Sequence, residues 1–258
     1  RDVEIYFPLY NAVNKLYIGV KEGCKVLPAK EYKHKKPVLF YGSSITQGGC
    51  VSQSGNCYSS ILSRMLDTDI INLGFAGSAK AEPTIVSYLA SLDPSVFFID
   101  YDHNSPSEEH LKSTYKPLYS AIRAKHPDTP IVMVTSCNVE FMYHGNERKE
   151  IIYDVYKEAI ANGDKNLYFI DGATLFGDED RDYCMVDACH PSDVGSLYMA
   201  KAIYPVLDKI LNKLIEFGVL CNDTKVQLTP EGKFTKIGDP TEVAMTDLAI
   251  NTGYNPLD

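Results

Sequence analysis

The sequence lacks any apolar run approaching the roughly 20 residues that a membrane-spanning helix needs, so we expect no membrane segment. It also lacks an excess of positive charge, because 25 Lys and Arg residues stand against 34 Asp and Glu residues, a net charge of −9. Nucleic-acid affinity rests largely on Lys and Arg, so this balance argues against a nucleic-acid partner. These absences and the ordinary composition predict a globular protein of the soluble class.

The seven cysteines form no Cys-x-x-Cys pair. Neither a zinc site nor a disulfide framework is therefore indicated, and we expect no metal or other cofactor. Cys50 and Cys57 could bridge in an oxidising compartment, but reduced thiols are the more economical interpretation. The chain begins at Arg1 with neither a basic stretch nor an apolar leader after it. Any signal peptide would therefore already be absent, and the reduced thiols favour a cytoplasmic protein over a secreted one.

The most informative stretch lies between Pro37 and Gly49, where a short apolar run ends in Gly42, Ser43 and Ser44. An apolar run bounded by Pro and Gly is typical of a buried strand. A small-residue turn after it would place a serine hydroxyl at the carboxyl end of the strand, where open α/β sheets build their binding crevice. The alternative is a plain tight turn with a helix N-cap.

A candidate base and acid stand far downstream, in the sequence Asp187-Ala-Cys-His190. A serine hydroxyl is a weak nucleophile at neutral pH and needs an imidazole to take its proton. The imidazole in turn needs a carboxylate that fixes its tautomer. Asp187 and His190 could supply both groups from one turn. By itself such a pair favours a helix cap or a surface hydrogen bond, but together with the serine turn it favours catalysis.

Four segments, in this order, resemble the sequence blocks of the SGNH (GDSL-type) hydrolases. Residues 42–46 (Gly-Ser-Ser-Ile-Thr) are similar to the first block, and residues 187–191 (Asp-Ala-Cys-His-Pro) are similar to the last. Between them, residues 71–77 resemble the second block, and residues 100–104 stand in the place of the third. The resemblance covers about residues 35–212 and implies a serine hydrolase that acts on esters.

The resemblance also implies site residues. Ser44 would be the nucleophile, His190 the general base, and Asp187 the acid that orients the imidazole. The backbone N–H groups of Ser44 and Gly77 and the side chain of Asn104 would bind the oxyanion. Together these groups would form and break down an acyl-enzyme.

Two departures from the family pattern stand out. Ser43 occupies the position where the family name-motif has Asp, which we expect to be tolerated because that residue is outside the triad. The third block ends in Asn104 without the usual Gly-x-Asn-Asp pattern, and it resembles a branch of the family with an Asp-Tyr-Asp-x-Asn sequence. His103 could line the substrate pocket or lie in a surface loop. Asp100 and Asp102 are expected to make supporting hydrogen bonds rather than to form a glycosidase pair.

From residue 37 onward, strand-like runs alternate with helical patterns. The expected strands are residues 38–41, 70–73, 96–101, 131–135 and 167–170, and the expected helices lie near 56–67, 81–91, 107–125, 147–162 and 193–216. Such alternation predicts a parallel sheet with right-handed crossovers. The expected fold is therefore α/β: a three-layer α/β/α sandwich with a five-stranded parallel sheet. This is the flavodoxin-like fold that the resemblance also implies.

The ends of the chain differ from this pattern. Residues 1–36 are β-rich and are expected to be a remnant of an upstream β-domain, which members of this branch often carry; the alternative is an edge hairpin on the core. Residues 37–216 are expected to form the hydrolase domain. Residues 217–258 resemble a fragment of the nucleotide-binding domain of P-type cation-transporting ATPases, because of residues 219–223 and 237–245. We expect this tail to be an appended fragment without pump activity, or else a loop-plus-helix extension of the hydrolase.

The same resemblance bears on the substrate. The family includes lipases, thioesterases and esterases that remove acetyl groups from sugars, and this branch is similar to carbohydrate acetylesterases. The sequence has no long apolar lid segment, and its 18 tyrosines could stack on sugar rings. We expect hydrolysis of a short-chain ester, an O-acetyl ester of a carbohydrate or similar small polar molecule. The alternatives are a lysophospholipase or thioesterase of the same family, or a non-catalytic nucleotide- or carbohydrate-binding module.

Overall fold

The structure, a computed structural model, describes residues 3–220, 225–228, 234–238, 243, 246–247 and 250. The chain divides into two units, residues 1–204 and residues 205–258. The helix α6 (Asp193–Leu220) contains the boundary between them and continues through Pro205.

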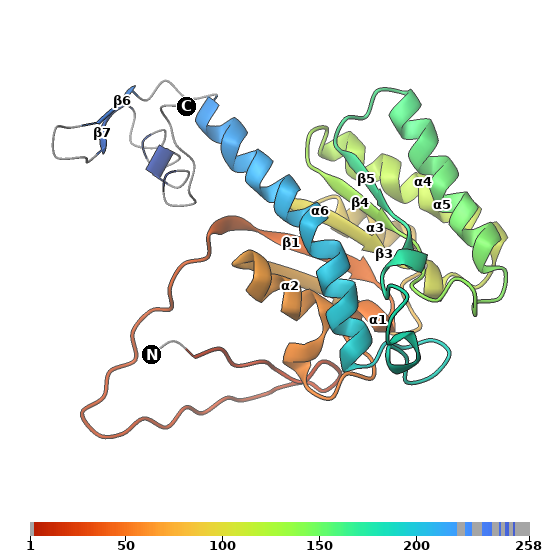
Figure 1. The fold of residues 1–258 in the computed structure, drawn as a ribbon, viewed down its shortest axis with the longest axis horizontal. Helices are drawn as coiled ribbons and strands as arrows, with labels where there is room; N and C mark the ends of the chain where they lie inside the picture. The colour runs from red at the N-terminus through yellow and green to blue at the C-terminus, as the bar shows by residue number, and fades with distance from the viewer. Residues whose placement is uncertain are drawn as a thin grey trace. The chain divides into compact units, whose positions relative to one another are not determined.

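The first unit is built on a five-stranded sheet in which every neighbouring pair of strands is parallel. The strand order is β2-β1-β3-β4-β5, which is one of the two common orders of doubly wound α/β proteins. The strands are β1 (His34–Gly42), β2 (Thr68–Gly74), β3 (Val96–Asp100), β4 (Ile131–Val134) and β5 (Leu167–Ile170). The predicted five-stranded parallel sheet is confirmed (Figure 1).

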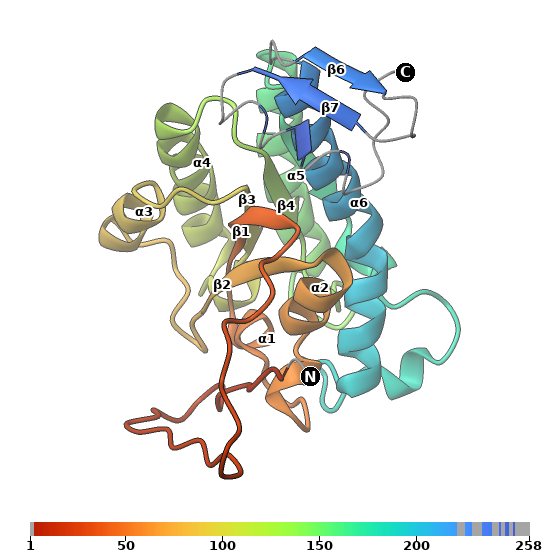
Figure 2. The same cartoon turned by 90° about the vertical axis from the view of Figure 1, so that its left-hand side faces the viewer.

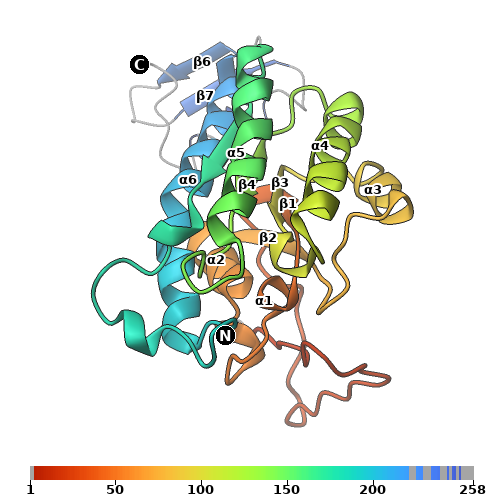
Figure 3. The same cartoon turned by 90° about the vertical axis from the view of Figure 1, so that its right-hand side faces the viewer.

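Helices connect the strands and cover both faces of the sheet. The α-helices are α1 (Ser44–Gln47), α2 (Tyr58–Leu66), α3 (Pro83–Leu89), α4 (Glu108–Lys125) and α5 (Gly145–Ala161). The 3-10 turns are η1 (Ser54–Asn56), η2 (Asp102–Asn104), η3 (Gly172–Thr174) and η4 (Arg181–Tyr183). Figure 3 shows α3, α4 and α5 on one face of the sheet, and α2 with the first part of α6 on the other. The predicted three-layer α/β/α sandwich is confirmed.

Strand β1 shows how the core is made. Leu39 and Tyr41 belong to the apolar cluster between the sheet and α3, α4 and α5. Phe40 points to the opposite face, where its ring packs edge-on against Tyr58 of α2 with 5.8 Å between ring centroids. Because both faces of a parallel sheet are covered, its strands are continuous apolar runs rather than alternating ones. This is the pattern by which the strand was predicted.

Residues 3–33 do not form the predicted strands. This segment has no helix or strand, and β1 begins at His34. Figure 2 shows the segment as a long trace without arrows. Its large exposed apolar residues are Val3, Ile5, Tyr6, Phe7, Tyr10, Val13, Leu16, Tyr17, Ile18, Val20, Val26, Leu27 and Tyr32. A strand needs a neighbour that satisfies its backbone groups, and an isolated hairpin is marginal in water. The predicted strands are therefore not formed in residues 3–33, and the interpretation of residues 1–36 as a β-rich remnant of an upstream domain stays a prediction.

The second unit contains the end of α6 and a pair of antiparallel strands, β6 (Lys225–Leu228) and β7 (Phe234–Ile237). The residues that carry the ATPase resemblance, 219–223 and 237–245, lie mostly outside the described residues, so the predictions for the tail stay predictions. In the part of the chain that the structure describes, no helix combines the length and the apolar character that crossing a membrane requires.

Candidate active site

Three neighbouring strands end in the segments that the sequence singled out. Strand β1 leads into α1 with Ser44, β2 leads into the turn with Gly77, and β3 leads into η2 with Asn104. Strand β1 lies between β2 and β3, so the segments that follow β2 and β3 lie on either side of the segment that carries Ser44. The carboxyl ends of strands in an open α/β sheet are where ligands bind.

The two serines after β1 have different roles in the local structure. The Ser43 Oγ accepts a hydrogen bond from the Ile45 N–H at 3.1 Å and so caps α1. The Ser43 N–H donates to the Asp100 carbonyl at 3.2 Å, which ties the turn to β3. A Cβ at Gly42 would lie only 2.3 Å from the same Asp100 carbonyl, so only glycine fits there. The N-cap interpretation therefore holds for Ser43, and Ser44 is the first residue of the helix.

The structure brings the three predicted triad residues together. The Ser44 Oγ lies 2.9 Å from the His190 Nε2. The His190 Nδ1 lies 2.9 Å from the Asp187 Oδ2. An Nδ1–H that donates to the carboxylate leaves Nε2 as an acceptor for the serine hydroxyl. The order serine, imidazole, carboxylate is the arrangement in which a serine hydroxyl can be activated as a nucleophile.

Asp187 is held by the backbone of its own loop. Its Oδ1 accepts hydrogen bonds from the Cys189 N–H at 2.7 Å and from the His190 N–H at 2.5 Å. The side-chain hydrogen bond from His190, followed by these backbone N–H groups, lowers the pKa of Asp187 to about 2. An isolated bridge between Met185 and Pro191 closes the loop. Asp187 is therefore an ionised, oriented carboxylate at neutral pH although its side chain is 51% exposed.

A polar network anchors this loop to the end of β4. The Asn138 Nδ2 donates to the Ala188 carbonyl. The Ser136 Oγ donates to the Asn138 Oδ1 at 2.8 Å and, as an acceptor, contacts the His103 Nε2. The Cys189 thiol lies 3.9 Å from the His103 Nδ1. His103 thus lies against the 187–190 loop, and burial lowers its pKa. A direct contact of His103 with substrate stays a prediction.

The turn after β2 is fixed so that Gly77 faces open space. Gly77 has a φ of +69°, the left-handed region that glycine adopts without strain, and nothing lies within 4 Å of where its Cβ would be. The preceding Ala76 N–H donates to the Gln47 Oε1 at 2.9 Å. After β3, the Asn104 Oδ1 accepts a hydrogen bond from the Ala79 N–H at 3.3 Å. The Nδ2 of Asn104 is therefore the free end of the amide.

Three hydrogen-bond donors consequently stand at the ends of three adjacent strands. The N–H groups of Ser44 and Gly77 and the Nδ2 of Asn104 donate to no acceptor within the described ranges. Donors that are held in place but unpaired are what an oxyanion site requires.

The buried carboxyl group of Asp100, at the end of β3, supports the turn that carries Ser44. The Asp100 Oδ2 accepts hydrogen bonds from the Thr46 Oγ1 and the Tyr58 hydroxyl, each at 3.1 Å. Burial, and then the neighbouring Asp102, raises the pKa of Asp100 to about 8, so it is mainly a neutral acid at pH 7. The Asp102 Oδ2 accepts from the Ser136 N–H at 3.0 Å. Both carboxyl groups make the supporting hydrogen bonds expected from the sequence.

Sequence reasoning missed two positioning residues. Gln47 holds the Ala76 N–H with its Oε1 and donates from its Nε2 to the Leu9 carbonyl at 2.9 Å, so it ties α1 to the Gly77 turn. Asn138 holds the loop of the triad through Ala188. The sequence feature that could have identified both residues is their position shortly after the carboxyl ends of β1 and β4. A polar residue after a strand is too common to be chosen on that signal alone.

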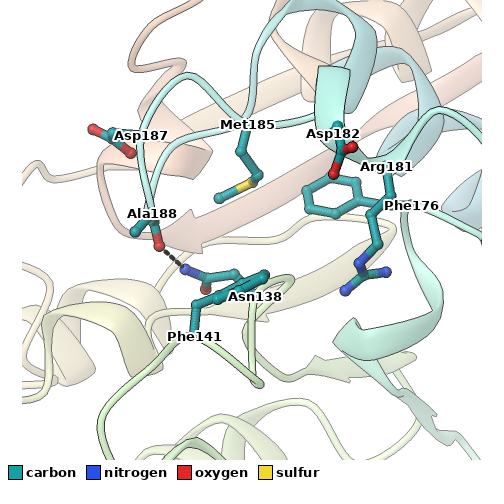
Figure 4. A pocket seen from close by; sticks show the side chains of 8 residues that line it. All are labelled: Asn138, Phe141, Phe176, Arg181, Asp182, Met185, Asp187 and Ala188. Carbon is teal, nitrogen blue, oxygen red and sulfur yellow. Dashed lines mark hydrogen bonds between the residues drawn. The ribbon is translucent and has the colours of Figure 1, made fainter.

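A cavity of about 230 Å³ lies beside the same loop. It is lined by Asn138, Phe141, Phe176, Arg181, Asp182, Met185, Asp187 and Ala188 (Figure 4). The Asp187 carboxylate points away from the other labelled side chains. Arg181 pairs with Glu140 and lies over the Phe176 ring. The aromatic and apolar walls suit an apolar group or the face of a ring.

Comparison with known proteins adds independent findings. Residues 35–208 match the model of the GDSL-like lipase/acylhydrolase family. No curated protein matches the chain in sequence. A solved structure described as a GDSL-like lipase from Bacteroides ovatus shares 31% identity with a TM-score of 0.71, over 80% of this chain and 62% of that one. The chain therefore spans about three fifths of the length of that protein.

Two further solved structures are more distant. A family two carbohydrate esterase from Clostridium thermocellum, in complex with cellohexaose, has 20% identity and a TM-score of 0.56, over 74% of this chain and 67% of that one. A two-domain esterase (CEX) active on acetylated mannans has 21% identity and a TM-score of 0.53, over 68% of this chain and 49% of that one. At these identities the likeness shows the fold alone.

The family match covers more than half of the chain and includes all four segments that were singled out in the sequence. The resemblance to SGNH (GDSL-type) hydrolases is confirmed, and the chain belongs to the GDSL-like lipase/acylhydrolase family.

Proposed function

We propose that this protein is a serine esterase that acts through a covalent acyl-enzyme. Its substrates are short-chain esters, namely O-acetyl esters of a carbohydrate or of a similar small polar molecule. One observation carries the proposal: an unbroken line of hydrogen bonds runs from the Ser44 Oγ through the His190 ring to the Asp187 carboxylate. The family membership and the free donors around Ser44 support it.

In the first half of the reaction, the Ser44 Oγ attacks the ester carbonyl carbon while the His190 Nε2 takes the hydroxyl proton. Asp187 stabilises the imidazolium that forms, because its carboxylate is ionised and bonded to Nδ1. The oxyanion is bound by the N–H groups of Ser44 and Gly77 and by the Asn104 Nδ2. The C–O ester bond then breaks, His190 returns the proton to the leaving alcohol, and the acyl group stays on Ser44.

In the second half, a water molecule takes the place of the alcohol. His190 removes a proton from this water as its oxygen attacks the acyl carbon, and the same three donors bind the second oxyanion. When the bond to the Ser44 Oγ breaks, His190 returns the proton to the serine. A carboxylic acid is released, and the enzyme is restored.

The carbohydrate part of the proposal is supported by two kinds of observation. Fold neighbours include an esterase active on acetylated mannans and a carbohydrate esterase in complex with cellohexaose. In this chain, large aromatic side chains are exposed near the 187–190 loop, among them Phe141 of the cavity wall at 67% and Tyr183 at 70%. Exposed aromatic faces suit sugar rings, which present apolar C–H faces for stacking.

The test is hydrolysis of p-nitrophenyl esters of increasing acyl length by the wild type and by two variants. We expect turnover of the acetyl ester, with a loss of about 10⁴-fold or more in Ser44→Ala and in His190→Ala, because the triad acts as one unit. Ser91→Ala is the matched control, because its exposed hydroxyl bonds only within its own turn, and should leave the rate unchanged. Wild-type rates no higher than those of Ser44→Ala across the short esters would disprove the esterase proposal.

The same panel separates the substrate classes. We expect the rate to fall as the acyl chain lengthens from acetyl to octanoyl, and we expect acetate release from acetylated oligosaccharides. Faster hydrolysis of octanoyl esters or of lysophospholipids than of acetyl esters would instead support a lipase-like or thioesterase activity of the same site.

A further inference from the structure

Cys50 lies beside the triad, although no sequence pattern links them. One donor atom from each of Cys50, Asp187 and His190 lies within 4.8 Å of the other two. Cys50 belongs to the loop after α1, whereas the other two residues belong to the loop before α6. The sequence shows no metal ligands at short regular spacing, and for that reason no metal site was predicted here.

We propose that Cys50, Asp187 and His190 form a binding site for a thiophilic divalent cation, Zn²⁺ foremost, and that occupation of this site switches off the hydrolase. Thiolate, imidazole and carboxylate are the three ligand types that Zn²⁺ prefers. Ca²⁺ and Mg²⁺ prefer oxygen ligands, so a set with one sulfur, one nitrogen and one oxygen disfavours them.

The spacing of the donors fits such an ion after a small adjustment. With bonds of about 2.0–2.3 Å, ligands of a tetrahedral Zn²⁺ lie about 3.5 Å from one another. Donor atoms that are already within 4.8 Å of one another need to move by only about an ångström. Three protein ligands leave the fourth position for a water molecule.

The backbone beside Cys50 runs close to the imidazole of His190. Cys50 has a φ of +67°, in the left-handed region that residues other than glycine rarely adopt. At the preceding Gly49, a Cβ would lie 3.1 Å from the His190 Cδ2 and 3.1 Å from the Ser44 carbonyl oxygen. The missing side chain at Gly49 thus allows the loop to approach the ring closely. Cys50 and Asp187 are exposed, so an ion can reach the site from solvent.

A cation bound to either ring nitrogen of His190 prevents this residue from acting as the general base. A cation on the His190 Nε2 displaces the Ser44 hydroxyl from its acceptor. A cation on Nδ1 breaks the hydrogen bond to Asp187 and leaves the proton on Nε2, which then cannot accept another. When the cation binds, the Cys50 thiol releases its proton to solvent and no electrons are transferred. The inhibitory consequence rests on the proposed function, but the metal site itself does not.

The site is tested with Co²⁺, which reports thiolate ligation by a sulfur-to-metal charge-transfer band in the near ultraviolet. We expect this band in the wild type and in Cys24→Ser, a matched control because Cys24 is also an exposed free thiol. We expect it to be lost in Cys50→Ser and strongly weakened in His190→Ala. No band in the wild type, or an equal band in Cys50→Ser, would overturn the proposal. An undiminished band in His190→Ala would reduce the site to a thiol alone and overturn it as well.

The switch is tested by Zn²⁺ titration of p-nitrophenyl acetate hydrolysis. We expect reversible inhibition that a chelator relieves, and an inhibition constant at least about tenfold higher in Cys50→Ser, equivalent to about 1.4 kcal/mol of lost binding. Without Zn²⁺, Cys50→Ser should hydrolyse the ester as the wild type does. Equal inhibition of both proteins would contradict the switch. A wild type that shows the cobalt band but no esterase activity would contradict the proposed function while the metal site stands.

Discussion

The side-chain oxygen of Asn104 accepts a hydrogen bond from the Ala79 backbone N–H at 3.3 Å, and this contact fixes which end of the amide is free. The free Nδ2 is the group that we propose for the oxyanion. We predict that Asn104→Ala lowers kcat by about 10²–10³-fold with little change in KM, because the donor acts mainly in the transition state. Asn104→Asp should lose at least as much, because a carboxylate cannot donate. An unchanged kcat in either folded variant would remove Asn104 from the oxyanion site.

Gln47 is predicted to act through the turn that carries Gly77. Its Oε1 holds the Ala76 N–H, and its Nε2 holds the Leu9 carbonyl. Gln47→Ala loses both contacts, so we expect kcat to fall about tenfold, which corresponds to about 1.4 kcal/mol of transition-state stabilisation. Gln47→Glu keeps the acceptor for Ala76 and should retain most of the activity. Equal losses in the two variants would show that the contact with Ala76 is not what matters.

The pKa of Asp187 predicts a stability effect in acid. The hydrogen bond from the His190 side chain, followed by the backbone donors, lowers this pKa from 3.8 to about 2. A lowered pKa in the folded state stabilises the fold above the unfolded pKa, and the effect is lost as the pH falls through the folded pKa. The free energy of unfolding of Asp187→Asn should therefore differ from that of the wild type at pH 5, where the carboxyl group is ionised in both the folded and the unfolded state, and the difference should shrink between about pH 4 and 2.

Urea unfolding at a series of pH values measures this difference. Solvent screens the half-exposed Asp187 side chain, so the stability difference should be small. The effect on catalysis should be large, because loss of the orienting carboxylate commonly lowers kcat by about 10⁴-fold. A stability difference that stays constant down to pH 2 would show that the hydrogen bond between Asp187 and His190 does not form in solution.

The contribution of Asp100 to the free energy of unfolding is predicted to have the opposite pH dependence. Burial, and then Asp102, raises the pKa of Asp100 from 3.8 to about 8, while hydrogen bonds from Thr46 and Tyr58 act the other way. A raised pKa leaves stability fully present below the unfolded pKa and removes it as the pH rises through the folded pKa. The wild type should therefore lose stability relative to Asp100→Asn between about pH 4 and 8, by at most about 1.4 kcal/mol per pH unit.

Asp100→Ala provides the contrast. It leaves the buried Thr46 hydroxyl without its acceptor, whereas the Tyr58 hydroxyl can still donate to the Thr46 Oγ1 at 3.2 Å. The variant should therefore be destabilised at every pH, by about 1–3 kcal/mol for the unsatisfied group. Asn resembles the neutral acid and can still accept both hydrogen bonds. Parallel curves of unfolding free energy against pH for the wild type and Asp100→Asn would show that Asp100 is ionised in the folded protein.

The order of strands and helices could be predicted because burial on both faces of the sheet leaves a strong trace in the sequence. Strand β5 occupies residues 167–170, as expected, and the bounds of the other strands differ from the prediction by only a few residues. The segment before His34 shows the limit of such reasoning. Its pattern from Val3 to Tyr10 suits a strand, but a strand also requires a partner, which the local sequence does not specify.

The candidate triad could also be chosen from the sequence, because Ser44 follows a buried strand and the pair of Asp187 and His190 matches a family block. Their approach to within hydrogen-bonding distance depends on the fold, which places their two loops at one edge of the sheet. Gln47 and Asn138 could not be chosen, because they act through single backbone groups of distant residues. Such contacts exist only after the chain has folded.

Reaction with a fluorophosphonate tests most directly whether Ser44 is the nucleophile. The serine oxygen attacks phosphorus and fluoride leaves, so the adduct is stable enough for peptide mapping by mass spectrometry. We predict one adduct on the peptide that contains Ser44, formed in step with loss of esterase activity and absent in His190→Ala. Loss of activity with the label on a different residue, or full activity in protein labelled at Ser44, would contradict the proposed mechanism.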